Sequence, residues 1–418
     1  MQQTKESTGM KVINNIQNKK QNLISHEEIR SMLAHELKES ALNLVKDLFR
    51  AEITELCGEL FQRKNTELFH RAGTNPGSIL LKGQRVKVTK PRVKHNKKEV
   101  DLNSYTALQS YDLLQDRVMG HMLHGVSTRD YNKLVEEVSG GVGLSKSSVS
   151  RVFKNGSKKS LEEINSRDLS KYNFLSVMID GIEFGGKMLI VAVGITESMH
   201  KVVLGLRLGD SENSEVCTDL LTSIIARGFD KNKKYLFVLD GAKALRTAVV
   251  RVFGEDTAIQ RCIRHKERNI ISYLPKQYHM ELRRQWKLLH GMVHYEAAKK
   301  ELEKLKYWLK NINLESYASL EEAGEETLTV IKLQVPGKIR STLMSTNPIE
   351  SIFSQVRGKS QRIKRWKKNG DQVTRWSASI LLEIESKNHR YSYCKKDIEI
   401  IKYNLNKRNN LNENKIAA

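Results

Sequence analysis

The sequence has few cysteines, fewer acidic than basic residues, and no long apolar run. No apolar stretch approaches the ~20 residues that a transmembrane helix requires. The first residues also lack the charged and apolar segments of a secretory signal. The cysteines lack the spacing of a disulfide framework, which suits a reducing cytosol. We therefore expect a cytoplasmic protein with no membrane partner. The four cysteines are Cys57, Cys217, Cys262 and Cys394.

Positive charge is the strongest feature of the composition. The 418 residues include 71 Lys plus Arg against 48 Asp plus Glu, which gives a net charge of +23 and a pI near 9.7. A basic excess of this size in a cytosolic chain indicates a polyanionic partner, and nucleic acid is the commonest one. The alternative is a lysine-rich surface without a specific partner. The distribution of the charges along the chain distinguishes the two.

The first hundred residues divide into three stretches. Residues 1–25 are polar and are expected to form a disordered tail. Residues 26–69 place apolar side chains at helical spacing, which predicts two helices in a small helical domain. Residues 71–98 begin with a turn-forming segment and continue as a basic β-segment, which either contacts phosphates or forms a solvated face. We assign residues 26–105 to one N-terminal helical and basic segment.

Residues 106–168 have the pattern of a helix-turn-helix DNA-binding domain. One amphipathic helix is followed by a second, with Ser127 as N-cap and Asp130 as its capping partner. A third helix carries serine and lysine at its N-terminal end, where a recognition helix meets the DNA groove and its phosphates. Small three-helix units without a DNA function share this pattern. The predicted DNA contacts are Ser145, Lys146, Ser147, Ser148 and Arg151.

Residues 169–275 indicate the first part of an α/β core. Three apolar strands with short connections predict an antiparallel meander. Two helix–strand pairs follow, which predicts two further strands added in parallel. This is the ribonuclease H-like arrangement of a mixed sheet, in which the ends of the first and fourth strands lie side by side. The expected strands are 175–179, 188–195, 201–208, 235–239 and 257–260, and the expected helices are 214–227 and 242–253.

The first and fourth of these strands are each followed by Asp-Gly. Asp180 comes after one apolar run and Asp240 after the other. A single Asp-Gly is typical of a turn. Two ionised carboxylates held a few ångströms apart repel each other unless a proton or a cation lies between them. Two acids at matching strand ends therefore indicate a divalent cation, which prefers hard oxygen ligands.

The rest of the chain is predicted to be helical and becomes strongly basic. Residues 276–338 form an all-helical insertion, and residues 339–394 complete the core. Asn347, as N-cap before a proline, starts a helix whose first turn contains Glu350, either as a capping partner or as a third acid beside a cation. Residues 395–418 are expected to be a frayed tail. The predicted DNA contacts are Arg357, Lys359, Arg362, Lys364 and Arg365.

Four motifs in this order resemble the Mutator-type transposases of bacterial insertion sequences. The resemblance covers roughly residues 100–390. It implies that Asp180, Asp240 and Glu350 form a DDE catalytic triad on a ribonuclease H-like core, which a helical insertion interrupts before the glutamate. The motifs are Met178-Ile-Asp-Gly, Val238-Leu-Asp-Gly-Ala, Cys262-Ile-Arg-His-Lys-Glu-Arg-Asn and Thr346-Asn-Pro-Ile-Glu-Ser.

The resemblance also implies a reaction, a cofactor and partners. Such an enzyme binds the terminal inverted repeats of its element, cuts at the ends, and joins the freed 3′-hydroxyls to target DNA. The three carboxylates would hold two Mg²⁺ ions, for which Mn²⁺ would substitute, and no covalent enzyme intermediate is needed. Because two element ends must be cut together, we expect a homodimer or a larger assembly on double-stranded DNA, at the bacterial nucleoid.

Cys262 and His265 match the Cys-x-x-His element of that family. They lack the second pair of ligands that a structural zinc site requires. A structural or DNA-positioning role is favoured, with a buried cysteine and a helix-capping histidine as the alternative. The basic residues around them are predicted to contact phosphates, and these are Arg261, Arg264, Lys266 and Arg268.

Two other functions fit the same residues. One is a ribonuclease H-like nuclease that cuts DNA but does not join it. The other is a non-catalytic regulator that binds DNA through the helix-turn-helix, with the three acids serving as structural caps. The fate of the DNA distinguishes them, since only a transposase joins the cut 3′-end to a second duplex.

Overall fold

The computed structural model describes the greater part of the chain. By its internal contacts the chain divides into two units, residues 1–156 and 157–418, and the boundary falls within α6 (Lys146–Ser166). The described residues are 26–60, 69–81, 84–109, 112–131, 145–184, 186–209, 213–363, 365–367, 370–387 and 391–416. The disordered tail predicted for residues 1–25 lies outside them.

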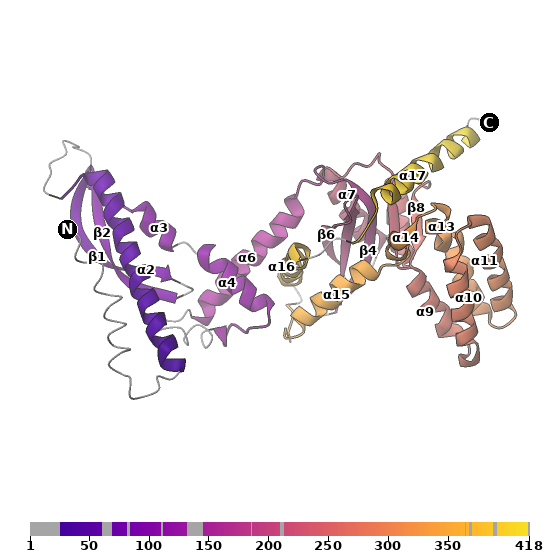
Figure 1. Ribbon diagram of the computed structural model, residues 1–418, viewed down its shortest axis with the longest axis horizontal. Coiled ribbons are helices and arrows are strands. Elements are labelled where there is room, and N and C mark those ends of the chain that lie inside the picture. The colour runs from indigo at the N-terminus through magenta and orange to yellow at the C-terminus, as the bar shows by residue number, and fades with distance from the viewer. Residues whose placement is uncertain are drawn as a thin grey trace. The chain divides into compact units, whose positions relative to one another are not determined.

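The first unit combines one long helix with an antiparallel sheet (Figure 1). The helix places Val45, Phe49 and Ile53 one turn apart on one face, and this face packs against Ile79 and Val93 of the sheet. The three strands lie in the order β1-β2-β3. The elements are α2 (His26–Cys57), β1 (Phe69–Leu81), β2 (Gln84–His95), β3 (Lys98–Val100) and α3 (Asn103–Gln109).

The prediction of two helices over residues 26–69 was therefore wrong, since one helix spans His26–Cys57. One helix covers the first apolar pattern and ends at Gly58, which has φ +81° and donates its N–H to the Thr54 carbonyl. The segment expected to form a turn lies inside β1, where the pairing with β2 shifts between Arg71 and Thr74. Gly73 has φ +80° there, so the glycine forms an irregularity in a strand rather than a chain reversal. The predicted basic β-segment is confirmed as β2.

Two helices of the predicted helix-turn-helix are described, α4 (Asp112–Leu123) and α6. Between them, Ser127 Oγ accepts the Asp130 N–H at 3.1 Å and donates to the Asp130 carboxylate at 2.6 Å, which confirms the predicted cap. Most of the helix predicted after this cap falls on residues 132–144, which lie outside the described residues.

The second unit is built on a five-stranded mixed sheet with the order β6-β5-β4-β7-β8 (Figure 1). The first three strands pair antiparallel, and β7 and β8 are added in parallel. The predicted meander and its parallel extension are thus confirmed. The strands are β4 (Phe174–Phe184), β5 (Lys187–Thr196), β6 (Lys201–Gly209), β7 (Leu236–Leu239) and β8 (Ala258–Arg261).

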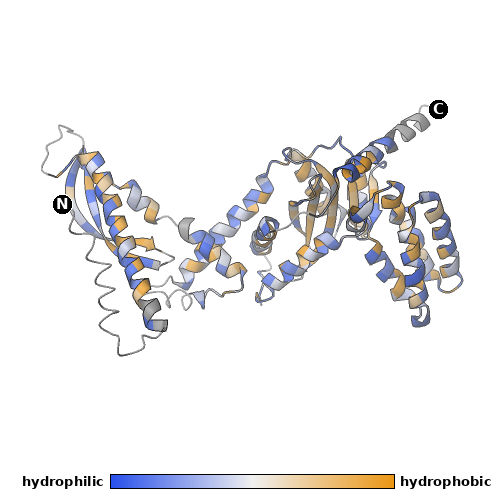
Figure 2. Ribbon diagram, in the orientation of Figure 1, coloured by the Kyte–Doolittle hydropathy of each residue, from blue (hydrophilic) through white to orange (hydrophobic). Residues whose placement is uncertain are grey.

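Both faces of this sheet are covered, so its central strands are apolar throughout. Figure 2 shows these strands as hydrophobic, whereas the helices around them have hydrophilic outer faces. Ile179 and Leu239 belong to the core cluster formed with α7 (Ser214–Ala226) and α8 (Lys243–Phe253). Because successive strand side chains alternate between faces, Asp180, which follows Ile179 within β4, belongs to the opposite face. Asp240 follows the last residue of β7.

A group of helices lies beside the β8 edge of the sheet (Figure 1). It confirms the helical prediction for residues 276–338, and it begins earlier than predicted because α9 starts directly after β8. Its elements are α9 (Ile263–Tyr273), η1 (Lys276–Tyr278), α10 (His279–Gly291), α11 (Tyr295–Lys310), α12 (Leu314–Ala323), η2 (Gly324–Leu328), α13 (Thr329–Lys332) and α14 (Gly337–Leu343).

Three helices end the chain, and the last corrects the prediction of a frayed tail. Residues 395–416 form a helix in which Ile401 is fully buried, and Asn404 Nδ2 donates to the Leu333 carbonyl at 2.9 Å. Apolar packing on one face thus holds a segment whose Asn- and Lys-rich composition suggested disorder. The helices are α15 (Asn347–Ser360), α16 (Gln372–Lys387) and α17 (Lys395–Ile416). Among the described helices, none combines the length and apolar character that crossing a membrane takes.

The docking of α17 can be tested with two adjacent isoleucines. Ile401 is 0% exposed and Ile400 is 41% exposed. We expect Ile401→Ala to lower the free energy of unfolding by about 2–5 kcal/mol, because it leaves a cavity in a packed interface. Ile400→Ala should change it by less than about 0.5 kcal/mol. Urea denaturation followed by circular dichroism measures both. Equal effects would mean that α17 is not docked.

Candidate active site

The parallel pairing of β4 and β7 sets the positions of the two aspartates. Ile179 is paired with Leu239, so Asp180 and Asp240 occupy the next positions on neighbouring strands, which lie about 4.8 Å apart. β7 ends at Leu239 as predicted, but β4 continues to Phe184. The prediction that the first strand stops at the acid was therefore wrong. Asp180 lies inside the strand and pairs with Val191 of β5.

The two carboxylates have different local roles. Asp180 is only 6% exposed, and its Oδ1 accepts the Gly181 N–H at 2.8 Å within a continuing strand. The turn interpretation therefore does not apply to it. Asp240 does form a local turn, since its Oδ1 accepts the N–H groups of Gly241 at 2.5 Å and Ala242 at 2.9 Å. These hydrogen bonds from two backbone N–H groups fix the orientation of the Asp240 side chain.

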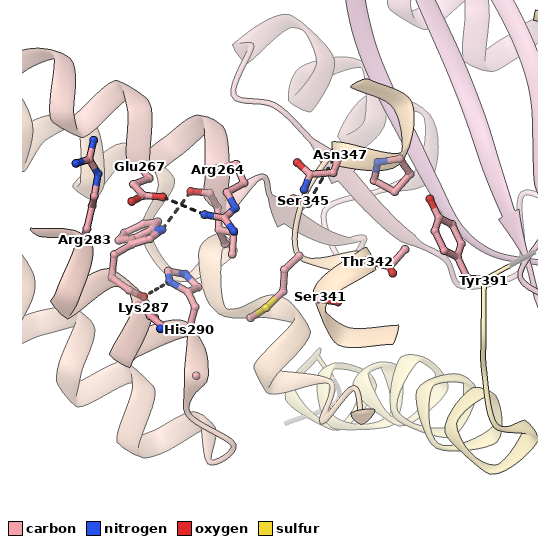
Figure 3. Close-up of a pocket in the computed structure, with 15 residues that line it drawn as sticks. Arg264, Glu267, Arg283, Lys287, His290, Ser341, Thr342, Ser345, Asn347 and Tyr391 are labelled. Atoms are coloured by element: carbon pink, nitrogen blue, oxygen red, sulfur yellow. Dashed lines mark hydrogen bonds and ion pairs between the residues drawn. The ribbon is translucent and has the colours of Figure 1, made fainter. Parts of the chain in front are cut away.

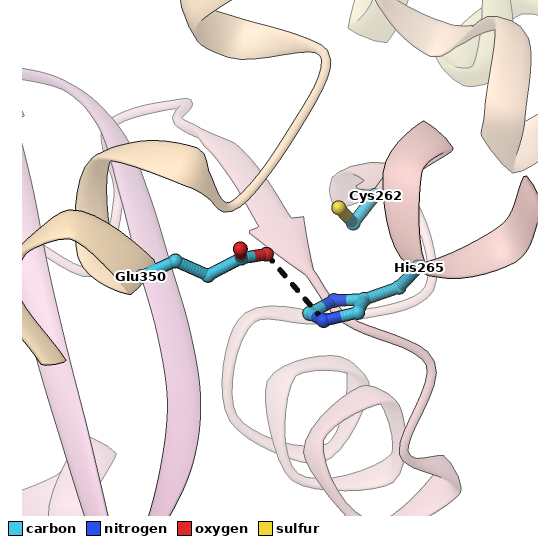
Figure 4. A group of neighbouring side chains, drawn as sticks. All are labelled: Cys262, His265 and Glu350. Atoms are coloured by element: carbon cyan, nitrogen blue, oxygen red, sulfur yellow. Dashed lines mark ion pairs between the residues drawn. The ribbon is translucent and has the colours of Figure 1, made fainter. Parts of the chain in front are cut away.

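Glu350 projects from the first turn of α15 toward the end of β8 and the start of α9 (Figure 4). The N-cap of α15 is Thr346, so the prediction of Asn347 was wrong by one residue. The Glu350 carboxylate lies 3.2 Å from Thr346 Oγ1 and 3.4 Å from His265 Nε2. It thus engages a histidine from another helix, and the interpretation of Glu350 as a capping partner of Asn347 is not supported.

Cys262, His265 and Thr346 form a small polar cluster around Glu350. The Cys262 sulfur is fully buried and accepts bonds from the Thr346 N–H and hydroxyl, each at 3.3 Å. His265 Nδ1 lies 3.4 Å from Thr346 Oγ1. The donor atoms of Cys262, His265 and Glu350 all lie within 4.8 Å of one another, close enough for three ligands of one metal ion. The Cys-x-x-His element thus meets the predicted glutamate.

Cys262 and His265 shift each other's pKa. The hydrogen bond to Cys262 raises the pKa of His265 to about 9. Burial opposes this shift, and the negative charges of Cys262, Glu350 and Asp180 reinforce it. Burial alone would raise the pKa of the Cys262 thiol, but hydrogen bonds from His265 and Thr346 outweigh it and lower that pKa. These interactions favour the protonated form of His265.

Two of the predicted phosphate contacts are buried instead. Arg261 is 0% exposed and bonds Glu322 at 2.7 Å and the Gly241 carbonyl at 3.1 Å. Lys266 is 3% exposed, bonds the same glutamate at 2.9 Å and donates to the Ser319 carbonyl. Both predictions were wrong, because α12 covers these side chains and supplies their counter-charge. Arg264 and Arg268 are exposed as a DNA contact requires.

The other predicted contacts differ in exposure. Ser145 caps α6, since its Oγ accepts the Ser148 N–H at 3.1 Å. Lys359 is paired with Glu383 at 2.9 Å, so its charge is locally neutralised. Lys364 lies outside the described residues. Lys146, Ser147, Arg151, Arg357, Arg362 and Arg365 are exposed.

A cavity of 710 Å³ opens beside the start of α15. Figure 3 shows Arg264, Arg283 and Lys287 on the helices along one side and Asn347 on the other. A second hollow shares Arg264, Arg283 and Asn347 with it and adds Arg268, so the two form one groove. On α15 its lining reaches Pro348, two residues before Glu350. The sequence pattern did not single out α10, because Arg283 and Lys287 belong to no motif.

A family model described as "Transposase, Mutator family" matches residues 14–389. The chain belongs to this family. Among its relatives, the transposase of insertion sequence element IS1201 from Lactobacillus helveticus is 26% identical over 81% of this chain and 91% of its own length. The transposase of IS256 in transposon Tn4001 from Staphylococcus aureus is 24% identical over 86% and 94%. That of IS6120 from Mycolicibacterium smegmatis is 28% identical over 56% and 73%.

In this Mutator-family chain, Glu322 is expected to hold the helices against the sheet. Glu322→Gln would leave Arg261 and Lys266 as buried cations without their counter-charge and should lower the free energy of unfolding by about 3 kcal/mol. Glu315→Gln, at an exposed position of the same helix, is the control and should change it by less than about 0.5 kcal/mol. Urea denaturation compares the two. A similar effect of both substitutions would contradict the structural role of Glu322.

A buried histidine at the wall of the groove predicts acid sensitivity. Burial lowers the pKa of His290 from 6.5 to about 4, so the folded chain stays neutral there while the unfolded chain binds a proton. The neutral ring contributes fully to the free energy of unfolding above pH 6.5. This contribution falls by about 3 kcal/mol in all as the pH drops toward 4. Unfolding free energies measured between pH 7 and pH 4.5 should fall less steeply in His290→Gln. Parallel curves would exclude His290 as the source.

Proposed function

We propose that the chain is the transposase of an insertion sequence, which binds the ends of its element, cuts them, and joins the 3′-ends to target DNA. Family membership supports transposition, and the relatives described above are transposases of insertion sequence elements. The basic composition is consistent with double-stranded DNA as the partner. A homodimer or larger assembly on DNA follows from the need to cut two ends together.

The observation that supports this proposal is the position of three acids around the ends of β7 and β8. Asp180 and Asp240 directly follow the paired residues Ile179 and Leu239, and Glu350 contacts His265 at the start of α9, directly after β8. We propose that the sheet, with three antiparallel strands and two parallel ones, is a ribonuclease H-like core. The acids would then be its DDE triad, drawn from β4, from the end of β7 and from α15.

The donor chemistry of these residues fits Mg²⁺ or Mn²⁺. All three offer carboxylate oxygens, the ligands that such ions prefer, and two neighbouring carboxylates with one nearly buried favour a cation between them. Asp180, Asp240 and Glu350 would hold two ions. Bound there, the ions would activate the attacking water or 3′-hydroxyl and neutralise the leaving oxygen of an in-line phosphodiester displacement.

The chain's own residues would hold these acids in place. Backbone N–H groups donate hydrogen bonds to Oδ1 of both aspartates and hold their side chains in place. Thr346 and His265 orient the Glu350 carboxylate from one side, so that it does not have to be ordered when DNA arrives. Arg357 lies seven residues after Glu350, two turns along the same face of α15, and is exposed. It is placed to contact a phosphate beside the reacting one.

The DNA contacts of the proposed function combine two regions. In the first unit, Lys146, Ser147 and Arg151 are exposed near the N-terminal end of α6, where a recognition helix contacts phosphates and bases. In the second, Arg264 and Arg268 of α9 are exposed on the helix that also carries His265. Separate contacts would allow recognition of the element end and positioning of the cut strand.

Removal of any one acid tests the proposed function. We expect Asp180→Asn, Asp240→Asn and Glu350→Gln each to reduce cleavage by about 10³-fold or more, since losing even an outer partner of a metal site typically costs 10- to 100-fold. DNA affinity should change less than about threefold, because the basic surface is retained. The assay uses labelled duplex from the DNA that flanks the gene, with Mg²⁺, and scores both cut and joined products.

Glu183→Gln is the matched control, because Glu183 is an exposed acid on β4 three residues after Asp180. It should cut and join normally. If an acid variant retains wild-type cleavage, that acid is not part of the triad. Cut products without joined ones would instead favour a nuclease, and DNA binding without cutting by the wild-type protein would favour a non-catalytic regulator.

A further inference from the structure

We infer that the groove between α9, α10 and the start of α15 binds the phosphate backbone of DNA next to the scissile phosphate. This inference rests on the proposed function for the identity of the scissile site, and it adds α10 as a DNA-contacting element. The name "basic groove" is used below for its four cations and the residue that faces them. These are Arg264, Arg268, Arg283, Lys287 and Asn347.

The concentration of unpaired positive charge in the groove carries the inference. Away from the groove, several cations of the helical group are paired with glutamates: Arg284 bonds Glu281 at 2.7 Å and Lys304 bonds Glu301 at 3.1 Å. Lys299 and Lys306 are paired in the same way. Within the described residues, no ion pair joins Arg268, Arg283 or Lys287 to a carboxylate. Lys276, Lys300 and Lys310 also have no ion pair among the described residues, but they do not line this hollow. The groove gathers four cations along one hollow, and this concentration of positive charge favours an anion there.

The one acid in the groove does not neutralise it. Glu267 lies 3.7 Å from Arg264, and its side chain is 15% exposed. It offsets one of four positive charges. Arg283 and Lys287 are one helical turn apart on α10, both are exposed, and Figure 3 shows them projecting beside this acid on the same wall. Their spacing presents two charges along one line, as a phosphate backbone requires.

The chemistry of the wall favours phosphates over bases. Two aromatic rings line the cavity, Trp286 and Tyr391. Trp286 is 3% exposed, and its Nε1–H donates to the Ile263 carbonyl at 3.2 Å, so it offers no open face for stacking, the usual contact with an unpaired base. Tyr391 is half-buried, and Lys201 Nζ lies 5.0 Å from the centroid of its ring. The opposite wall begins with Ser345 and Asn347, which offer hydrogen-bond donors to phosphate oxygens. Glu350 follows in the same turn of α15, so a DNA strand bound in the groove would lead to this acid.

Paired double variants of the full-length chain test this inference. Arg283→Ala/Lys287→Ala removes two charges from the groove, and Arg284→Ala/Lys304→Ala removes two paired charges elsewhere in the helical group. The probe is a duplex from the DNA that flanks the gene, in Ca²⁺ to prevent cleavage. At 150 mM salt we expect the groove variant to bind about 10- to 100-fold more weakly, with a log K against log salt slope smaller by about 1.8 for two lost phosphate contacts.

The control variant should change affinity by less than about twofold and leave the slope unaltered. Arg283→Lys/Lys287→Arg should restore binding, which separates charge from folding. Wild-type affinity and slope in the groove variant would overturn the inference. So would loss of binding in the control variant to the same degree, because that would reflect overall charge.

Crosslinking locates the bound strand. A photoreactive group on Arg283→Cys, in a Cys394→Ser background because Cys394 is exposed, should label nucleotides next to the cleavage point, whereas the same group on Lys304→Cys should not. Labelling remote from the cut would overturn the placement. Failure of the proposed function would look different: the groove variants would still lose DNA affinity, but the wild-type chain would yield no cut or joined product.

Discussion

The register between β4 and β7 is the constraint on which the site depends. Pairing of Ile179 with Leu239 brings Asp180 and Asp240 to adjacent positions. Alternation of side chains along β4 then places Asp180 on the face away from α7 and α8, and Asp240 follows at the end of β7. A shift of one residue in either strand would send one carboxylate into the apolar core. The apolar run of each strand fixes the register, so the packing of the core also sets the position of the site.

Two further contacts join distant segments to that face. Arg261, at the end of β8, bonds both the Gly241 carbonyl and Glu322, and so connects the turn after Asp240 to α12. Thr346 bonds the Cys262 sulfur, which connects the start of α15 to the end of β8 across 84 residues of sequence. The helical group between them is therefore anchored on both sides, and it returns the chain so that Glu350 lies beside His265.

Charge in the second unit is organised by its position relative to the site. The buried cations Arg261 and Lys266 share Glu322. Several exposed cations of the helical group are paired along the helix, whereas four cations gather along the groove with one glutamate among them. Net charge indicates only that a polyanion is a partner. The gathering of cations in the groove is the basis for proposing where on the helical group it binds.

The sequence by itself determined the core of the second unit, because its strands are short apolar runs with clear ends and its helices have strong periodicity. The order of strands, the adjacency of Asp180 and Asp240 and the helical insertion all follow from those local patterns. Strand β1 was missed because glycine within a strand resembles a turn signal, and the docking of α17 was missed because a polar composition hid three buried side chains, Ile398, Ile401 and Leu405.

Only the tertiary structure decided which charged residues are available. Lys266 and Arg268 are two positions apart and identical in pattern, yet α12 buries the first and leaves the second exposed. The same holds for the partner of Glu350, since nothing in the local sequence of α15 distinguishes a cap from a contact with His265 on another helix. Burial and charge pairing depend on segments far apart in the chain, and local periodicity carries no information about them.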